Sequence, residues 1–386
     1  MKVTIIGGGI GGLTAGIALR NRGIEAHVYE RSPALMEVGA GISLWPNAVK
    51  ALRSLGLGEA LRSISPDAAD FAMRRWNGAI ISRTPEREME QRFGGGVMLL
   101  HRAELLDVLA KSFGRDNLHL DHACTGIEED GAGVIARFSN GETVRADVLV
   151  GADGLHSVVR GSLGHRDPVR YSGYTAWRSV VRFDVTRIVP CESWGYGKRF
   201  GIHPLTNGRV YWYATANVPE GEGKAGEAQM DVLLSLFAGW HEPVEELVRA
   251  SGASGSSGAA ILRNDIYDRD PIREWGRGRV TLLGDAAHPM TPNLGQGACQ
   301  AIEDAVEVAW HLSSEPEAEA ALRGYEAARV DRTASIVLGS RRFGALGQVN
   351  SPMLCRLRDL ALRLTPGAVS LRSIAPVVGY ESPHWD

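Results

Sequence analysis

The sequence predicts an α/β fold in which a doubly wound, Rossmann-like sheet carries an inserted antiparallel β-sheet and ends in a C-terminal helix. Three observations predict it. The apolar run at residues 3–6 is followed by a glycine cluster at residues 7–12 and then by helical apolar spacing. Two later apolar runs end in Gly-x-Asp or Gly-Asp, and the segment between them is rich in β-branched and aromatic residues.

The first element is a βαβ unit. Residues 3–6 predict a buried strand, residues 13–23 a helix that ends at a glycine, and residues 26–30 a second strand. The cluster satisfies G-x-G-x-x-G in the context that a dinucleotide fingerprint needs, because its glycines let the backbone approach a pyrophosphate. A tight strand-to-helix turn would also explain the glycines, and the motif does not separate NAD from FAD. The residues concerned are Gly7, Gly9, Gly12 and Glu30, which follows about 20 residues later to accept from a ribose.

Two further strand ends favour FAD, because this cofactor is long enough to need partners beyond the first turn. The runs ADVLVGADG and RVTLLGDAA predict strands that end at Asp153 and Asp285. Asp285 can accept from a ribityl hydroxyl, and the turn at Pro292 can set the backbone path beside the ring. The next helix then opens with free N–H groups suited to negative charge on the flavin, at Gly295, Gly297 and Ala298.

The remaining elements define three parts. We expect a discontinuous FAD-binding domain at 1–70, 98–170 and 275–335, a β-rich substrate domain at 71–97 and 171–274, and a C-terminal helical segment at 336–386. The glycine and serine cluster that begins at Ser251 is typical of a flexible surface loop. Arginine-rich helical spacing continues to Thr365, and Pro366 is expected to end it.

Composition narrows the class of protein. Lysine and arginine total 42 against 45 acidic residues, a net charge of -3 that gives no reason to expect nucleic acid as a partner. The four cysteines are widely spaced, and the 11 histidines form no metal-ligand motif such as H-E-x-x-H. No stretch approaches the ~18 apolar residues that a membrane span requires. We therefore expect a cytoplasmic monomer or homodimer with no metal and no integral membrane association.

Taken together, the motifs GGGIGG, ADGLHSVVR and GDAAHPMTPNLGQG resemble those of the class A, single-component FAD-dependent aromatic hydroxylases. This is the family of salicylate hydroxylase, urate hydroxylase and zeaxanthin epoxidase. The stretches GISLWPNAVKAL, HRAEL and GYTAWR extend the similarity over about the first 330 residues. Many members carry Asn where Cys299 stands, but the urate hydroxylase and zeaxanthin epoxidase branches share the departure. The resemblance implies the p-hydroxybenzoate hydroxylase type of FAD domain.

The resemblance also implies roles for particular residues. Glu30 would bind the adenosine ribose, with Arg31 as a further cofactor-binding position, and Arg102 would contact the FAD phosphates. Asp153 would lie near the pyrophosphate and the approach of the nicotinamide nucleotide. Asp285 would hold the ribityl chain. FAD is thus the expected cofactor and NADH or NADPH the transient electron donor, with the choice between them open.

Substrate residues are expected in the β-rich insertion. Strand alternation puts Tyr211 and Tyr213 on one face of the segment RVYWY and its Val and Trp on the other. The stretch GKRFGIHPL followed by GRVYWY resembles urate hydroxylase, which makes Arg199 and Tyr211 the positions expected to act on substrate. Packing of the tyrosine in a sheet core and pairing of the arginine with a carboxylate remain equally open. Trp177 and Arg178 could flank the flavin ring or simply pack; the family pattern favours a place near the ring, and Arg178 is expected to be catalytic together with Arg199 and Tyr211.

The implied reaction is hydride transfer from NAD(P)H to the flavin, reaction with O2, and oxygen transfer from a C4a-hydroperoxide to a small aromatic, heteroaromatic or polyene substrate. Hydroxylation and epoxidation both fit. The alternatives are a non-oxygenating flavin-binding partner or sensor, and a flavin-dependent reductase or halogenase on the same fold. For His288 a structural role in the flavin loop is favoured over a general base, and for Cys299 packing over a reactive thiol.

Overall fold

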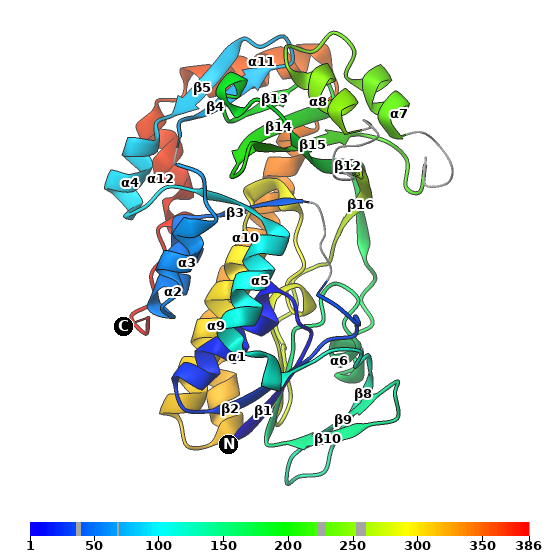
Figure 1. The fold of residues 1–386 in the computed structure, drawn as a ribbon, viewed down its shortest axis with the longest axis vertical. Helices are drawn as coiled ribbons and strands as arrows, with labels where there is room; N and C mark the ends of the chain where they lie inside the picture. The colour runs from blue at the N-terminus through cyan, green and yellow to red at the C-terminus, as the bar shows by residue number, and fades with distance from the viewer. Residues whose placement is uncertain (36–39, 68, 223–228, 252–259, 386) are drawn as a thin grey trace.

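The computed structural model describes residues 1–386 except 36–39, 68, 223–228, 252–259 and 386. A five-stranded sheet forms one end of the molecule (Figure 1). Its strands are β1 (Lys2–Ile6), β2 (Glu25–Tyr29), β7 (Leu118–His119), β11 (Val148–Gly151) and β17 (Val280–Leu282). They pair in parallel in the order β17-β11-β1-β2-β7. The carboxyl ends of β1, β11 and β17 therefore lie side by side, as the sequence predicts.

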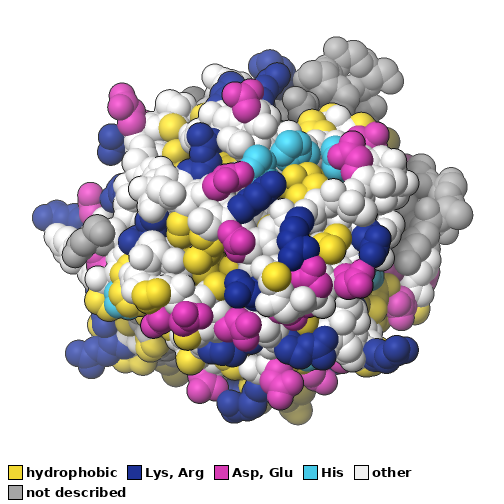
Figure 2. Space-filling view, turned by 90° about the horizontal axis from the view of Figure 1, so that it is seen from below, with side chains coloured by type: hydrophobic (Ala, Val, Ile, Leu, Met, Phe, Trp, Pro, Cys, Tyr) yellow, Lys and Arg dark blue, Asp and Glu magenta, His cyan; other side chains and the backbone are white. Residues whose placement is uncertain are grey.

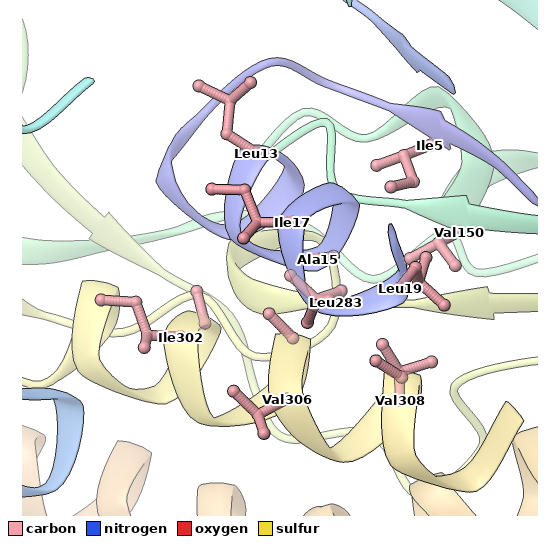
Figure 3. Close-up of a cluster of buried hydrophobic side chains, with 14 of the residues drawn as sticks. Ile5, Leu13, Ala15, Ile17, Leu19, Val150, Leu283, Ile302, Val306 and Val308 are labelled. Carbon is pink, nitrogen blue, oxygen red and sulfur yellow. The ribbon is translucent and has the colours of Figure 1, made fainter. Parts of the chain in front are cut away.

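Two helices pack together on this sheet because both bury small and aliphatic side chains. These are α1 (Ile10–Asn21) and α9 (Gly297–Ser314). Figure 3 shows Ala15, Ile17 and Leu19 of α1 facing Ile302, Val306 and Val308 of α9, within one buried cluster that also contains residues of β1 and β11. The glycine turn before α1 and the loop before α9 are thereby held against the same sheet.

Several smaller elements complete this unit. A three-stranded antiparallel sheet runs in the order β10-β9-β8, and β3 pairs with β6 in a two-stranded sheet. Helix α5 packs against α1, and α2 packs against α9. The bounds are β3 (Gly41–Leu44), α2 (Pro46–Ser54), α3 (Gly58–Ser63), β6 (Met98–His101), α5 (Arg102–Phe113), η1 (Arg115–Asn117), β8 (Cys124–Glu129), β9 (Val134–Phe138), β10 (Thr143–Ala146), α6 (Val158–Ser162), η3 (Gly284–Ala286) and η4 (Pro292–Leu294).

A seven-stranded, mainly antiparallel sheet forms the opposite end (Figure 1). Its order is β16-β12-β15-β14-β13-β4-β5, and one of its faces packs on helices α7 and α8. The other face carries Tyr211, Tyr213 and Arg199. The bounds are β4 (Phe71–Arg75), β5 (Ile80–Thr84), α4 (Glu86–Phe93), β12 (Arg170–Arg182), η2 (Val185–Arg187), β13 (Cys191–Trp194), β14 (Lys198–Leu205), β15 (Arg209–Ala216), α7 (Gln229–Leu236), α8 (Val244–Ala250) and β16 (Leu262–Asp268).

The C-terminal part contains more helix than the sequence predicts. The long helix α10 (Ala318–Gly347) is followed by α11 (Pro352–Leu364) and α12 (Gly367–Val378). Pro366 does follow the end of α11, but it is also the N-cap of α12, so the chain resumes as helix where a stop was expected. A proline is compatible with the first turn of a helix, because the N–H groups there have no intrahelical partner.

The doubly wound parallel sheet and the antiparallel insertion confirm the predicted fold class. We propose the same three-part division of the chain, since the seven-stranded sheet draws its strands from residues 71–84 and 170–268. The predicted surface loop after Ser251 falls largely on 252–259, outside the described residues. Over the part of the chain that is described, each helix is too short or too polar to cross a lipid bilayer.

Candidate active site

The glycine turn between β1 and α1 leaves no room for side chains at two positions. A Cβ on Gly7, whose φ is +110°, would lie 2.3 Å from the carbonyl oxygen of Ala152, and one on Gly12 would lie 1.9 Å from that of Gly7. A Cβ on Gly9 would instead meet nothing within 4 Å. Helix α1 also begins without a side-chain cap. The turn thus offers free backbone donors beside open space, which fits a pyrophosphate.

Glu30 follows β2 and closes this turn. Its carboxylate accepts from the Gly8 N–H at 2.7 Å and from the Ser32 N–H at 2.9 Å. The same carboxylate that sequence assigns to the ribose therefore also fixes the first glycines of the turn. Arg31 is exposed beside it. Ribose binding by Glu30 stays a prediction, as does cofactor binding by Arg31.

Asp153 follows β11 and caps a helix. Its carboxylate accepts from the Ser157 hydroxyl at 2.5 Å and from the backbone N–H groups of Val158 and Val159 at 2.7 and 3.2 Å. These bonds fix the first turn of α6. The backbone of Asp153 lies against Gly7, because a Cβ on that glycine would be 3.0 Å from the Asp153 Cα. Asp153 thus shapes the wall beside the glycine turn, and its nearness to a pyrophosphate stays a prediction.

Asp285 and Arg102 lie close enough for their charges to interact, and we call the space that they share the recess. Both side chains are exposed to solvent, yet desolvation raises the pKa of the Asp285 carboxyl and lowers the pKa of the Arg102 guanidinium. Side chains that solvent can reach and that are nevertheless desolvated face an open space that protein largely surrounds. Arg102 and His288 each offset part of the rise in the pKa of Asp285. The recess therefore holds an acceptor and a cation where the ribityl and phosphate parts of FAD are expected.

The loop after Asp285 leads into α9. Pro292 is exposed in η4, and Gly295 adopts a φ of +62°, where its missing side chain leaves room for the Trp45 indole. No side chain caps the N-terminus of α9. A Cβ on Gly297 would lie 3.9 Å from the Asp285 carboxylate. The N-terminus of α9, at Gly297 and Ala298, thus adjoins the recess, and binding of a flavin ring at its positive end stays a prediction, as it does for Pro292 and Gly295.

A buried ionic network holds this loop in place. His288 Nε2 lies 2.6 Å from Asp304 Oδ2. The other carboxylate oxygen of Asp304, Oδ1, accepts from Arg329 Nε at 2.7 Å. Arg329 also binds Glu303 at 2.6 Å, and the Gly284 N–H donates to Asp304 at 3.0 Å. All the side chains in this network are at most 2% exposed. His288 therefore connects the loop to α9 and α10, which supports the structural role over a general base.

Cys299 packs as the sequence predicts. Its Sγ lies 3.5 Å from the Trp45 N–H and 3.5 Å from the carbonyl oxygen of Gly295, so it joins α9 to two neighbouring segments. Burial raises the pKa of this thiol to about 12. A thiol that stays protonated at neutral pH is a poor nucleophile. The described geometry thus favours packing over reactivity.

We expect the native protein to expose little thiol to a disulfide reagent at pH 8. Cys124 is half-buried, whereas the other three cysteines are buried, and burial raises the pKa values of all four thiols. Cys124 should therefore react first and the rest only after unfolding. Absorbance of the thiolate released by Ellman's reagent measures this. A Cys124→Ser variant that still released one equivalent rapidly would contradict the assignment.

Tyr211 and Tyr213 project from β15 toward the FAD unit, while Val210 and Trp212 lie in the core under α7 and α8. The predicted alternation is confirmed. Two glycines make space for the rings: a Cβ on Gly41 would come within 2.3 Å of Tyr211, and one on Gly201 within 2.1 Å of Tyr213. Each tyrosine ring therefore packs against the backbone of a glycine, which restricts its orientation.

Arg178 lies on the same face as Tyr211, beside the recess. Burial raises the pKa of the Tyr211 phenol, and the guanidinium groups of Arg178 and Arg102 partly offset this rise. Arg178 Nη1 donates to Asn264 at 3.2 Å. The structure thus brings Arg178, Tyr211, Arg102 and Asp285 into one neighbourhood.

The expectation for Trp177 is wrong. Its side chain points to the opposite face of β12, where it is 2% exposed in the core and its Nε1 donates to Gln229 at 2.7 Å. Adjacent residues of a strand face opposite sides of the sheet, so Trp177 and Arg178 cannot both approach a ring on one side.

Arg199 lies farther along the site face and is 3% exposed. Its guanidinium donates to Asn293 Oδ1 at 2.6 Å and to Glu192 Oε1 at 3.3 Å, while its Nε has no hydrogen-bond partner. Tyr174 donates to the same Asn293 oxygen at 3.2 Å. Arg199 therefore bridges the β-sheet to the loop that precedes α9.

Sequence reasoning missed His203 and Phe71. The His203 ring stacks with those of Phe71, Tyr211 and Tyr213 at centroid separations of 6.0, 6.1 and 5.8 Å. Desolvation lowers the pKa of His203 to about 4, so it is neutral at pH 7, and its Nδ1 has no hydrogen-bond partner. The alternation Arg199, Gly201, His203 along β14 carried the signal that could have found it.

A comparison with protein families shows the family to which the chain belongs. A family model described as an FAD binding domain matches residues 1–340. The chain belongs to this FAD-binding family. The glycine turn, the recess and the uncapped helices α1 and α9 fit FAD independently, so the chain binds FAD as cofactor.

Relatives place the chain among the oxygenating members of this family. It is 45% identical over 366 residues to the aurachin C monooxygenase/isomerase of Stigmatella aurantiaca, covering 94% of each chain. It is 36% identical to an FAD-dependent urate hydroxylase of Klebsiella pneumoniae, covering 89% of each. The crystal structure of Klebsiella pneumoniae HpxO with FAD and uric acid matches with a TM-score of 0.91 and 33% identity, over 98% of this chain and 96% of that one. The chain is an FAD-dependent monooxygenase, and the resemblance to class A hydroxylases is confirmed.

Proposed function

We propose that this monooxygenase takes electrons from NADH or NADPH and inserts one oxygen atom of O2 into a small aromatic or heteroaromatic substrate. The observation that carries the proposal is the site face, where an aromatic stack and two arginines stand opposite the FAD recess. The stack consists of Phe71, His203, Tyr211 and Tyr213, and the arginines are Arg178 and Arg199.

The aromatic stack supports a flat substrate. Offset rings with centroids about 4.5–7 Å apart attract one another, so these side chains offer a surface on which a further ring could lie. Aliphatic residues adjoin them, including Leu99, Leu205 and Leu262. Relatives whose names specify urate and 3-amino-4-hydroxybenzoate as substrates support the same class. A polyene remains a poorer fit to stacked rings and paired arginines.

The arginines support a substrate that carries an acceptor. Arg199 is buried, and its free Nε is a donor that needs a partner, because an unpaired buried polar atom costs about 1–3 kcal/mol. Arg178 is half-buried beside Tyr211. A carbonyl, phenolate or carboxylate on the ring would satisfy either group. We infer that the pair orients the substrate along the sheet.

When bound, FAD would accept hydride from the nicotinamide and activate O2. The chain supplies the rest: the first N–H groups of α9 stabilise negative charge on the flavin ring, and Asp285 binds the ribityl hydroxyls. Tyr211 keeps its proton at neutral pH because burial raises its pKa. It can therefore donate a hydrogen bond to the substrate oxygen and hold the reacting carbon in position.

Isotope labelling tests the proposal. Candidate aromatic acids and purines would be screened for those that accelerate NADH or NADPH oxidation by the purified holoenzyme. Reaction under ¹⁸O₂ should then give a product heavier by one labelled atom. Product that lacks the label, or chloride-dependent halogenation, would refute oxygen insertion.

Replacing Tyr211 with phenylalanine should reduce the product formed per NAD(P)H oxidised by about tenfold, the effect of one lost hydrogen bond. FAD should stay bound, because Tyr211 contacts the substrate side of the recess. Paired assays of NAD(P)H oxidation and product formation would measure this coupling. Tyr196→Phe, at a tyrosine that is 41% exposed, is the matched control. Coupling equal to that of the wild type would return Tyr211 to a packing role.

A further inference from the structure

Helix α11 presents its apolar side to solvent. Met353, Leu357, Leu360 and Leu364 recur at helical spacing and are 66%, 57%, 51% and 71% exposed, and Leu354 beside them is 49% exposed. We call these five residues the leucine stripe. Single exposed leucines are common on proteins, but a contiguous row along one helix marks an interaction site.

The opposite face of α11 is polar and buried. Arg358 and Asp359 are 6% and 7% exposed and bind each other at 2.9 Å. Asp359 also binds Arg75 of β4 at 2.9 Å, and the Arg358 guanidinium lies 4.8 Å from the centre of the Trp194 ring. The helix is thus turned with the Arg358–Asp359 pair inward and the leucine stripe outward. Because ion pairs anchor the inner face, burial within the monomer does not explain the stripe.

Aromatic side chains surround the same end of the sheet. Trp76 and Tyr196 are 36% and 41% exposed and line a cavity of about 190 Å³ together with Arg356 of α11. Ile80 of β5, the strand against which α11 packs, is 42% exposed. Tryptophan and tyrosine are enriched where proteins meet the boundary between lipid and water.

The exposed charges of the chain segment that contains the stripe have one sign. Between residues 351 and 380 the exposed charged side chains are Arg356, Arg363 and Arg372, whereas the acidic residue of this segment, Asp359, is buried. Arg356 and Arg363 stand seven residues apart and so border one edge of the stripe. The face of the molecule shown in Figure 2 is different, since acidic and basic side chains intermingle there.

These observations indicate which kind of partner binds the leucine stripe. Two copies of this chain that met through it would bring arginines toward arginines, which opposes association. A bilayer that contains anionic phospholipid offers both an apolar interior for the leucines and phosphates for the guanidinium groups. We propose that α11 binds the surface of an anionic phospholipid membrane, with the leucine stripe at the boundary between headgroups and acyl chains.

The placement of α11 connects this surface with the substrate site. Gly347, at the end of α10, packs on the Arg199 side chain, since a Cβ there would lie 3.0 Å from its Cδ. The chain enters α11 five residues later, and Cys355 of α11 contacts the backbone after Trp194. Docking at α11 would therefore hold the site face close to the membrane, which suits a lipid-soluble substrate. The membrane inference itself does not depend on the proposed oxygen insertion.

Vesicle co-sedimentation of the full-length, FAD-loaded protein tests the proposal. Vesicles of phosphatidylcholine mixed equally with phosphatidylglycerol should sediment the wild type at low salt, and pure phosphatidylcholine should bind it at least tenfold more weakly. Leu357→Ser with Leu360→Ser should lower binding by at least tenfold. Arg356→Gln with Arg363→Gln should lower binding to the mixed vesicles by about fivefold for each arginine and leave the weak binding to phosphatidylcholine unchanged.

Val189→Ser is the matched control, because this valine is 50% exposed and lies at the far end of β13 from the contact with α11. It should bind like the wild type. Flavin absorbance and the unfolding temperature would show that each variant is folded. Wild-type protein that stays in the supernatant with both lipids would overturn the proposal, as would a leucine variant with unchanged binding. A dimer that the leucine variant converts to monomer, without vesicle binding, would identify a second copy as the occupant.

Discussion

Replacing Asp285 with alanine is expected to weaken FAD binding by roughly tenfold to a hundredfold. The reason is that Asp285 is an acceptor in a desolvated recess, and a hydrogen bond to a charged group contributes about 1.5–3 kcal/mol. Its carboxylate lies beside the first residue of α9 and near Arg102, so its loss also leaves that cation without its acidic neighbour. Titration of the apoprotein with FAD, followed by quenching of flavin fluorescence, would give the dissociation constant.

Asp270→Ala provides the control for Asp285→Ala. The Asp270 side chain is 81% exposed and pairs with Arg341 at the surface, so its removal should leave FAD affinity unchanged. Asp285→Asn should bind FAD with intermediate affinity, since the amide oxygen still accepts a hydrogen bond but carries no charge. An Asp285→Ala variant that bound FAD like the wild type would remove this residue from the ribityl assignment.

Arg329→Met is expected to destabilise the protein by about 3–5 kcal/mol, the cost of removing one partner from a buried ionic network, although Glu303 keeps Arg332 as a second partner. Glu303 and Asp304 each lose a partner that lies within 2.7 Å, and His288 and the flavin loop lose the far anchor of the network. Chemical denaturation monitored by tryptophan fluorescence would measure the free energy of unfolding. Arg273→Met is the control, because Arg273 and Asp331 form a pair that is more than 80% exposed on both sides and such pairs contribute about 0–1 kcal/mol.

The pH dependence of this difference has a defined sign. Burial raises the pKa values of Glu303 and Asp304, whereas Arg329 and the other ionic partners lower them. The lowering is the larger effect, so both pKa values lie below their ordinary values of 4.5 and 3.8. Groups with a lowered folded pKa stabilise the fold above the unfolded pKa and lose that contribution as the pH falls. The advantage of the wild type over Arg329→Met should therefore be full at pH 7 and shrink below about pH 4. An advantage that grew in acid would contradict this account.

The FAD unit could be predicted from sequence because its signals are local. Glycine spacing, strand ends and the start of α9 each occupy a few adjacent residues, and parallel pairing then brings Gly7, Asp153 and Asp285 to one edge. Strand alternation likewise gave the orientation of Tyr211 and Tyr213 correctly. These inferences needed only the periods of helix and strand.

The rest depended on contacts between distant segments. Alternation shows that Trp177 and Arg178 face opposite sides of β12, but only packing of α7 and α8 decides which side is the core. Strand alternation could have placed His203 on the site face, but nothing in the sequence indicated that it would stack against Phe71, which lies on another strand of the sheet. Arg329 and Asp304 are 25 residues apart on separate helices, so no local pattern revealed their contact.

The central strand β1 pairs with β11, which in turn pairs with β17, so the cofactor site collects its parts from the whole length of the FAD unit. During synthesis the glycine turn emerges early, whereas the flavin loop and its buried arginine follow only when residue 329 has left the ribosome. Until then, a nascent chain lacks the arginine that completes the ionic network behind its flavin loop. We therefore expect flavin uptake to follow the synthesis of residue 329, so that it can report whether a truncated chain has folded.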